Sequence, residues 1–136
     1  IALVESGRRN EGRGGYDPWP WTINAEEAGQ FFETKADAIA AVHDLRGRDV
    51  RSVDVGCMQV NLYFHPTAFP DLDAAFDPAA NAAFAARFLR SLFKDTGSWM
   101  HAVARYHSSV YRNNRQYMIR VMKTWRQLGG GKKRSR

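Results

Sequence analysis

Apolar residues recur at helical spacing in several stretches of this chain, and each such stretch predicts an amphipathic helix. In the first clear one, the apolar positions are three residues apart, at Ile39, Val42 and Leu45. Thr34, which precedes this stretch, and Asp37 in its first turn have the spacing of a capping box. A helix is therefore predicted over residues 35–46, ending near Gly47.

Three later helices are indicated by their start signals and by their apolar stripes. Asp77 followed by Pro78 is typical of an N-cap and a first helical position, and it predicts a helix through about Lys94. Ser98 is predicted to cap the next helix. The apolar stripe of the last helix consists of Met118, Val121, Met122, Trp125 and Leu128.

The N-terminal part of the chain follows another pattern. Residues 1–4 are apolar and indicate the end of a helix, with Glu5 at its C-terminal end, so we expect the native protein to extend further upstream. Residues 8–20 are rich in Gly, Arg and Pro and predict a loop. Two strands of a short hairpin are predicted at residues 19–24 and 30–34, with the intervening residues as the turn.

Length and composition are those of a single globular domain. A chain of 136 residues, 44% of them hydrophobic, can bury a core without disulfides. Together with the pattern above, this predicts a mainly α fold (α+β) with one small β-hairpin over residues 1–128. No apolar run approaches the ~18 residues of a membrane-spanning helix, so no membrane span is predicted.

The net charge of +6 is concentrated in the C-terminal part of the chain. No acidic residue follows Asp95, and residues 129–136 are predicted to form a basic, disordered tail. This asymmetry favours an acidic partner, such as nucleic acid, anionic lipid or the polyanions of a cell wall. Nucleic acid is not expected, because Tyr117 and Trp125 fall mostly on the apolar stripe of the last helix and not between its basic residues.

Chemistry that depends on a thiol, a metal or a nucleotide is not indicated by the sequence. Cys57 is the only cysteine and is interpreted as a small buried hydrophobe. The histidines show no metal-ligand spacing, and neither a dinucleotide-binding glycine fingerprint nor a phosphate loop occurs. No cofactor and no metal are therefore expected.

Three short blocks carry the candidate chemistry: Glu5-Ser6, then Gly56-Cys57-Met58-Gln59, then Arg105-Tyr106-His107. This ordered set resembles the signature of soluble-type lytic transglycosylases, relatives of goose-type lysozyme that cleave the glycan strands of bacterial peptidoglycan. In that family the blocks read Glu-Ser, Gly-Leu-Met-Gln and Ala-Tyr-Asn. The resemblance implies a lysozyme-like fold, in which residues from about 8 to 51 are an insertion between the first two blocks.

The resemblance also implies a reaction carried by one carboxyl group, for which Glu5 is the candidate. It would first protonate the glycosidic oxygen and then deprotonate the C6 hydroxyl of the same muramic acid, which closes a 1,6-anhydro ring. Burial among apolar side chains keeps such a carboxyl group protonated near neutral pH. The residues preceding Glu5 in the sequence are apolar.

The same resemblance assigns contacts with the substrate to the first two blocks. Ser6 follows the catalytic Glu, and Ser52 stands where the family often has Ser before the second block. Gly56 is expected to allow close approach of the backbone. Met58 is expected to pack beneath a sugar, and Gln59 to hydrogen-bond hydroxyl or N-acetyl groups.

The third block matches the family in its tyrosine and departs from it on both sides. The hydroxyl of Tyr106 is expected to reach the carboxyl group of Glu5 and to orient it. His107 stands where the family has Asn, and it would bring a charge near the site below pH ~6.5. Arg105 replaces a small residue.

Two alternatives stay open. Asp54, close before the second block, could be the second carboxylate of a hydrolytic, lysozyme-like muramidase. A catalytically silent glycan-binding scaffold domain would keep the same fold without the reaction.

The sequence also leads to expectations for the aromatic residues of the insertion, for the location of the protein and for its partners. The aromatic residues of the insertion either stack on sugar rings or anchor the insertion by packing; they are Trp19, Trp21, Phe31 and Phe32. The expected location is the periplasm or the cell wall. There the expected partners are peptidoglycan strands and a cell-envelope assembly of the flagellar, secretion or conjugation type.

Overall fold

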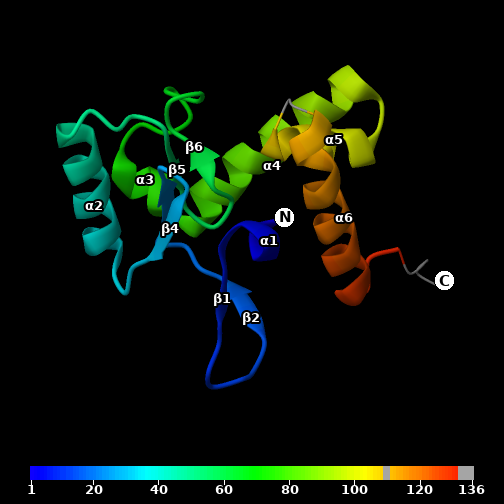
Figure 1. Ribbon diagram of the computed structural model, residues 1–136, viewed down its shortest axis with the longest axis horizontal. Coiled ribbons are helices and arrows are strands. Elements are labelled where there is room, and N and C mark those ends of the chain that lie inside the picture. Colours follow the sequence, from blue (N-terminus) through cyan, green and yellow to red (C-terminus); the bar gives the residue numbers. More distant parts are fainter. Residues whose placement is uncertain (109–110, 132–136) are drawn as a thin grey trace. The chain divides into compact units, whose positions relative to one another are not determined.

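The computed structural model describes residues 1–108 and 111–131, which fall into two compact units (Figure 1). The first, here called the sheet unit, comprises Ala2–Ala86. The second, here called the helical unit, comprises Arg87–Arg136 together with Ile1. The first two sequence blocks belong to the sheet unit and the third belongs to the helical unit.

Four short antiparallel strands form the main sheet of the sheet unit, in the order β4-β3-β5-β6. Their bounds are Thr22–Ala25 for β3, Ala28–Phe31 for β4, Val53–Val55 for β5 and Val60–Asn61 for β6. The hairpin predicted around residues 19–34 is thus confirmed as β3–β4. Its turn is tighter than predicted, because Glu26 and Glu27 make it alone, with φ angles of +52° and +63°.

One face of this sheet carries the core, because alternate strand residues point the same way. The helices that cover this face are α2, Lys35–Gly47, and α3, Leu72–Phe76. The helix predicted over residues 35–46 is confirmed as α2, and the Thr34 hydroxyl accepts a hydrogen bond from the Asp37 N–H at 3.1 Å. The buried core is Ile23, Ala25, Ala38, Val42, Leu45, Val53, Val55, Ala75 and Phe76. Each large apolar side chain in it contributes about 1.5–3 kcal/mol.

The remaining part of the sheet unit corrects the prediction of a single hairpin and a loop over residues 8–20. The short helix α1, Ala2–Ser6, leads directly into β1, Gly7–Arg9, which pairs with β2, Tyr16–Pro18. Figure 1 shows this second hairpin projecting away from the four-stranded sheet. The prediction failed because both strands are short and contain no buried residue, so no alternation of apolar and polar residues marks them.

Strands β5 and β6 were also not predicted, although they flank the second sequence block. Two buried valines around Asp54 give β5 an alternating pattern, but over three residues only. Such a short pattern is too weak a signal to be separated from loop. The consequence is that the block lies on a turn of the main sheet.

Helices predicted for the second half of the chain are confirmed. α4, Pro78–Thr96, begins in the sheet unit and continues in the helical unit, where α5, Trp99–His107, and α6, Tyr111–Gln127, follow. The Asp77 carboxylate accepts from the Ala80 N–H at 2.8 Å, and Ser98 is the N-cap of α5. Buried residues on α5 and α6 form the core of the helical unit: Ala102, Val103, Ala104, Tyr117 and Val121.

The C-terminal segment is described only in part. Residues 129–131 continue from α6 as a turn, in which the Gly130 N–H donates to the Trp125 carbonyl at 2.8 Å. Residues 132–136 of the predicted basic tail lie outside the described residues. Within residues 1–108 and 111–131, no helix has the length and apolar character needed to cross a bilayer.

Candidate active site

The second sequence block forms a tight turn between β5 and β6, here called the Gly56–Gln59 turn. Gly56 and Gln59 both have positive φ angles, +80° and +50°. The Gly56 N–H donates to the Thr22 carbonyl at 2.9 Å, and the Gln59 N–H donates back to the Gly56 carbonyl at 3.1 Å. These bonds fix the turn on β3 from one side.

Asn81 of α4 fixes the same turn from the other side. Its side chain is fully buried and uses every hydrogen-bonding position that an amide has. The Nδ2 atom donates to the carbonyls of Val55 and Ala75, both at 3.0 Å. The Oδ1 atom accepts from the Met58 N–H at 2.9 Å and from the Cys57 thiol at 3.5 Å.

The glycine of the turn is required by this amide. A Cβ atom on Gly56 would lie 2.3 Å from the Asn81 Nδ2 atom, closer than real Cβ contacts come. Asn81 was not among the residues singled out from the sequence. The available signal was a polar residue four positions before the buried Ala85, on the apolar face of a predicted helix.

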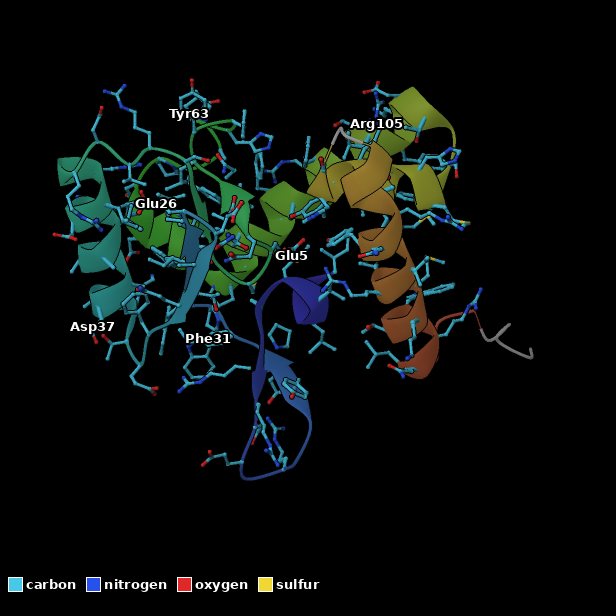
Figure 2. The ribbon with its side chains drawn as sticks, in the orientation of Figure 1. Glu5, Glu26, Phe31, Asp37, Tyr63 and Arg105 are labelled. Carbon is cyan, nitrogen blue, oxygen red and sulfur yellow. The ribbon has the colours of Figure 1, made fainter. Side chains whose placement is uncertain are left out.

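Ser6 joins the first block to the second. Its side chain is 1% exposed, and its hydroxyl donates to the Cys57 carbonyl at 2.7 Å, while the Ala2 carbonyl lies 3.2 Å away. Its own carbonyl accepts from the Trp19 N–H at 2.9 Å. The half-buried Glu5 on α1 (Figure 2) is therefore carried by a helix whose last residue is bonded to the Gly56–Gln59 turn.

Cys57 packs in the turn as a small apolar residue. Burial raises the pKa of its thiol above the ordinary value, so the thiol stays protonated and is a poor nucleophile. Its sulfur atom contacts the Asn81 amide, as described above. This environment supports the interpretation of Cys57 as a buried hydrophobe.

The side chain of Gln59 is largely committed to the protein backbone. Its amide nitrogen donates to the Thr22 carbonyl at 3.1 Å and to the Gly56 carbonyl at 2.9 Å. Both amide hydrogens are then used, which leaves the Oε1 atom as the group that could accept from a sugar hydroxyl or amide. Met58, whose N–H is held by Asn81, is half-buried beside it.

A row of polar side chains lies on the face of the sheet opposite the core. Asn24, Asp54 and Asn61 occupy paired positions on β3, β5 and β6. The Asp54 carboxylate accepts from the Asn61 amide at 2.8 Å and from the Asn24 amide at 3.5 Å. Ser52 is exposed next to this row, and its hydroxyl accepts from the Asn61 amide at 3.1 Å.

The third block lies on α5, in the helical unit. The Tyr106 ring is half-buried and packs on Phe88, with ring centroids 5.7 Å apart. His107 is exposed and stacks on the Tyr117 ring at 4.5 Å, the two planes being 10° apart. Within this unit the block is therefore held by aromatic packing, and a contact between Tyr106 and Glu5 stays a prediction.

Of the four aromatic residues at positions 19, 21, 31 and 32, Phe31 is 48% exposed and the other three are packed by the protein. Trp21 and Phe32 pack against the core of the sheet unit. The Arg8 guanidinium lies 4.5 Å from the Trp19 ring centre and forms an ion pair with Glu33. Trp19 also donates its indole N–H to the Phe32 carbonyl at 2.7 Å. The half-buried Trp19 is thus held by these contacts, which favours the anchoring interpretation for Trp19, Trp21 and Phe32.

Comparison with known families decides the affiliation of the chain. The family described as "Transglycosylase SLT domain" matches residues 32–123, about two thirds of the sequence. The chain belongs to this family. The matched region contains the Gly56–Gln59 turn and the third block, whereas Glu5 and Ser6 lie before it.

Membership fixes the general activity of the domain. Transglycosylase SLT domains act on the peptidoglycan of the cell wall, which indicates an extracytoplasmic place of work. The helices and small antiparallel sheets described above are compatible with the α+β, lysozyme-like fold of an SLT domain. No curated protein and no solved structure matches the chain.

Proposed function

We propose that this SLT domain is a lytic transglycosylase that cleaves the β-1,4 bond between N-acetylmuramic acid and N-acetylglucosamine with Glu5 as its single acid and base. The observation that carries the proposal is the 2.7 Å hydrogen bond from the Ser6 hydroxyl to the Cys57 carbonyl. It joins residues that are 51 positions apart and holds the helix bearing Glu5 against the Gly56–Gln59 turn of the matched family region.

The reaction needs two proton transfers, and both pass through the Glu5 carboxyl group. Glu5 donates its proton to the glycosidic oxygen as the bond to the anomeric carbon breaks, and an oxocarbenium-like centre develops on the muramic acid ring. The resulting carboxylate then takes the proton of the C6 hydroxyl of that ring. The C6 oxygen attacks the anomeric carbon, which closes the 1,6-anhydro ring, regenerates the acid and consumes no water.

The other candidate residues position the sugar. Gly56 lets the turn close on the buried Asn81 amide and so holds its shape, Met58 offers an apolar surface, and Gln59 offers its Oε1 atom as an acceptor. Ser52 is proposed to contact the substrate from its exposed position beside the polar row of the sheet. Tyr106 and His107 are proposed as further substrate contacts because they belong to the third block and lie within the matched family region.

A specific observation favours one second candidate, hydrolysis by two carboxylates. Asp54 receives hydrogen bonds from two asparagine amides on the sheet face that does not carry the core, which is an arrangement suited to a carboxylate. In an inverting hydrolase such a residue would activate water, and the product would be a reducing end.

Digestion of purified sacculi separates these candidates. The wild-type chain, Glu5→Gln and Asp54→Asn are compared, and released muropeptides are identified by mass spectrometry. We expect 1,6-anhydromuramic products from the wild-type chain and from Asp54→Asn, and a loss of roughly 100-fold or more in Glu5→Gln, the usual contribution of a general acid. Reducing-end products together with inactivity of Asp54→Asn would replace the proposal by the hydrolase.

Cellular context follows from the substrate. We propose that the protein works in the periplasm or at the cell wall, where its SLT domain opens glycan strands locally for a cell-envelope assembly. Fractionation of cells that produce the natural protein, followed by immunodetection, tests the location directly. Recovery with the cytoplasmic fraction would contradict it.

A further inference from the structure

Two neighbouring aromatic rings stand exposed on the loop that follows β6. Tyr63 is 58% exposed and Phe64 is 71% exposed, and their ring centroids are 5.3 Å apart in an edge-to-face arrangement. Figure 2 shows Tyr63 on this loop, directed away from the sheet. Large apolar side chains exposed side by side are typical of a binding surface.

Hydrogen bonds hold this loop in one conformation. The Asn61 Oδ1 atom accepts from the backbone N–H groups of both aromatic residues, at 3.0 Å and 3.1 Å. The N–H of His65 donates to the Asn61 carbonyl at 3.0 Å. The ring of His65 packs against Phe84 of α4 at 5.2 Å, which anchors the far end of the loop. The two exposed rings are therefore presented by a fixed backbone and need little ordering when they bind.

Asn61 connects the rings to the polar row of the sheet. Its Nδ2 atom donates to Asp54 and to Ser52, and its Oδ1 atom holds the aromatic loop, so all four hydrogen-bonding positions of the amide are used. The side chain of Asn61 thus connects Asp54 and Ser52 on one side with the backbone of the aromatic pair on the other.

Flat aromatic faces beside carboxylate and hydroxyl groups have the chemistry that recognises a pyranose ring. A sugar ring presents C–H groups on its faces, which pack on an aromatic ring, and hydroxyl groups on its edge, which need polar partners. We propose that Tyr63 and Phe64 form a stacking platform for a sugar unit of the glycan strand, adjoining the candidate active site. Because the two rings are nearly perpendicular, one ring stacks on the sugar and the other supports it from the side. This inference rests on the proposed function, because it takes the same polymer as ligand.

Binding to glycan strands tests the platform directly. The full chain carrying Glu5→Gln is used, so that the polymer is not cut, and the probe is peptidoglycan glycan freed of its peptide stems by amidase digestion. The variants are Tyr63→Ala/Phe64→Ala and Tyr63→Leu/Phe64→Leu, and the matched control is Tyr16→Ala, which removes another exposed tyrosine (64%) on β2. Thermal unfolding of each variant shows that the fold is kept.

We expect the double alanine variant to bind the glycan about 10-fold more weakly, as the loss of aromatic packing predicts. The double leucine variant keeps apolar area but has no flat ring, and it should bind almost as weakly. Tyr16→Ala should bind as the parent does. Equal binding of parent and double alanine variant, full binding by the double leucine variant, or no binding by the parent would each overturn the platform.

Failure of the platform and failure of the proposed reaction give different results. For this comparison Tyr63→Ala/Phe64→Ala is also made in the chain that keeps Glu5. Anhydro products from the wild-type chain, with an unchanged KM in that active double variant, would leave the reaction and remove the platform. Ring-dependent glycan binding without any anhydro product would leave the platform and remove the reaction.

Discussion

Two turns in the sheet unit are both held by an asparagine, yet they differ in what surrounds them. In the loop between β1 and β2, the Asn10 Oδ1 atom accepts from the N–H groups of Gly12 and Arg13, and these bonds are exposed to solvent. In the Gly56–Gln59 turn, the bonds of Asn81 lie in a fully buried site. Water can replace the first set of bonds and cannot reach the second.

The glycines of the two turns differ in the same way. Gly14 has φ +70° and nothing within 4 Å of the position of an added Cβ, whereas Gly56 has φ +80° and meets the Asn81 amide there. A residue other than glycine in the first loop would have to tolerate the backbone conformation only. At Gly56 it would also have to displace a buried amide. One sequence feature, glycine with a positive φ, therefore carries very different constraints in the two places.

The largest effect is expected from adding one methyl group at the buried turn. Gly56→Ala should lower the free energy of unfolding by about 4 kcal/mol, since strain of the left-handed backbone and a clash with Asn81 add together. Gly14→Ala is the matched change and should cost about 1 kcal/mol for its backbone alone. Urea unfolding of both variants measures the difference. Similar losses of unfolding free energy would contradict the contrast between the two turns.

Removing each asparagine side chain should give the next largest difference. Asn81→Ala eliminates four hydrogen bonds in a buried site, and we expect a loss of about 3 kcal/mol in unfolding free energy. Asn10→Ala removes bonds that water can replace and should cost less than about 1 kcal/mol. Urea unfolding again measures both variants. An equal loss of unfolding free energy would mean that burial does not determine the cost of removing these hydrogen bonds.

The smallest of the three effects concerns the hydrogen bond that joins helix α1 to the Gly56–Gln59 turn. Ser6→Ala removes the buried hydroxyl that donates to the Cys57 carbonyl, and it should lower the unfolding free energy by about 1.5 kcal/mol. It should also reduce the rate of sacculus digestion, because the helix of Glu5 is no longer held on the turn.

Ser91→Ala is the control for that variant. Its hydroxyl is exposed and bonds only to the Phe88 carbonyl of its own helix, at 2.8 Å, so stability and digestion should both stay within error. A Ser6→Ala protein with unchanged activity would show that the link serves stability alone.

Elements with long periodic patterns or distinct caps were predictable from the sequence. The capping box at Thr34, the Asp77-Pro78 start and the Ser98 cap each mark a helix that the structure contains. These signals act within one turn of helix, so they need no knowledge of the rest of the chain. The order of the three blocks similarly led to the family.

What escaped prediction depends on partners that are far apart in the sequence. Strands β1 and β2 pair through backbone groups, which any residue provides. Asn81 acts on a turn more than twenty residues before it, and no local pattern assigns it that role. The exposure of Tyr63 and Phe64 likewise depends on the folded chain, because an aromatic pair in the sequence does not show whether it is buried or exposed.

The bond from Ser6 to Cys57 also has a consequence for the order of folding. Closing a flexible loop of 51 residues costs about 3.5 kcal/mol in chain entropy beyond a constant, more than one hydrogen bond returns. Strands β3 and β5 and helix α2 lie within that loop and bring its ends together when they pack. We therefore expect the segment between Ser6 and Cys57 to fold first and Glu5 to reach its place last, so that a partly folded chain carries no competent site.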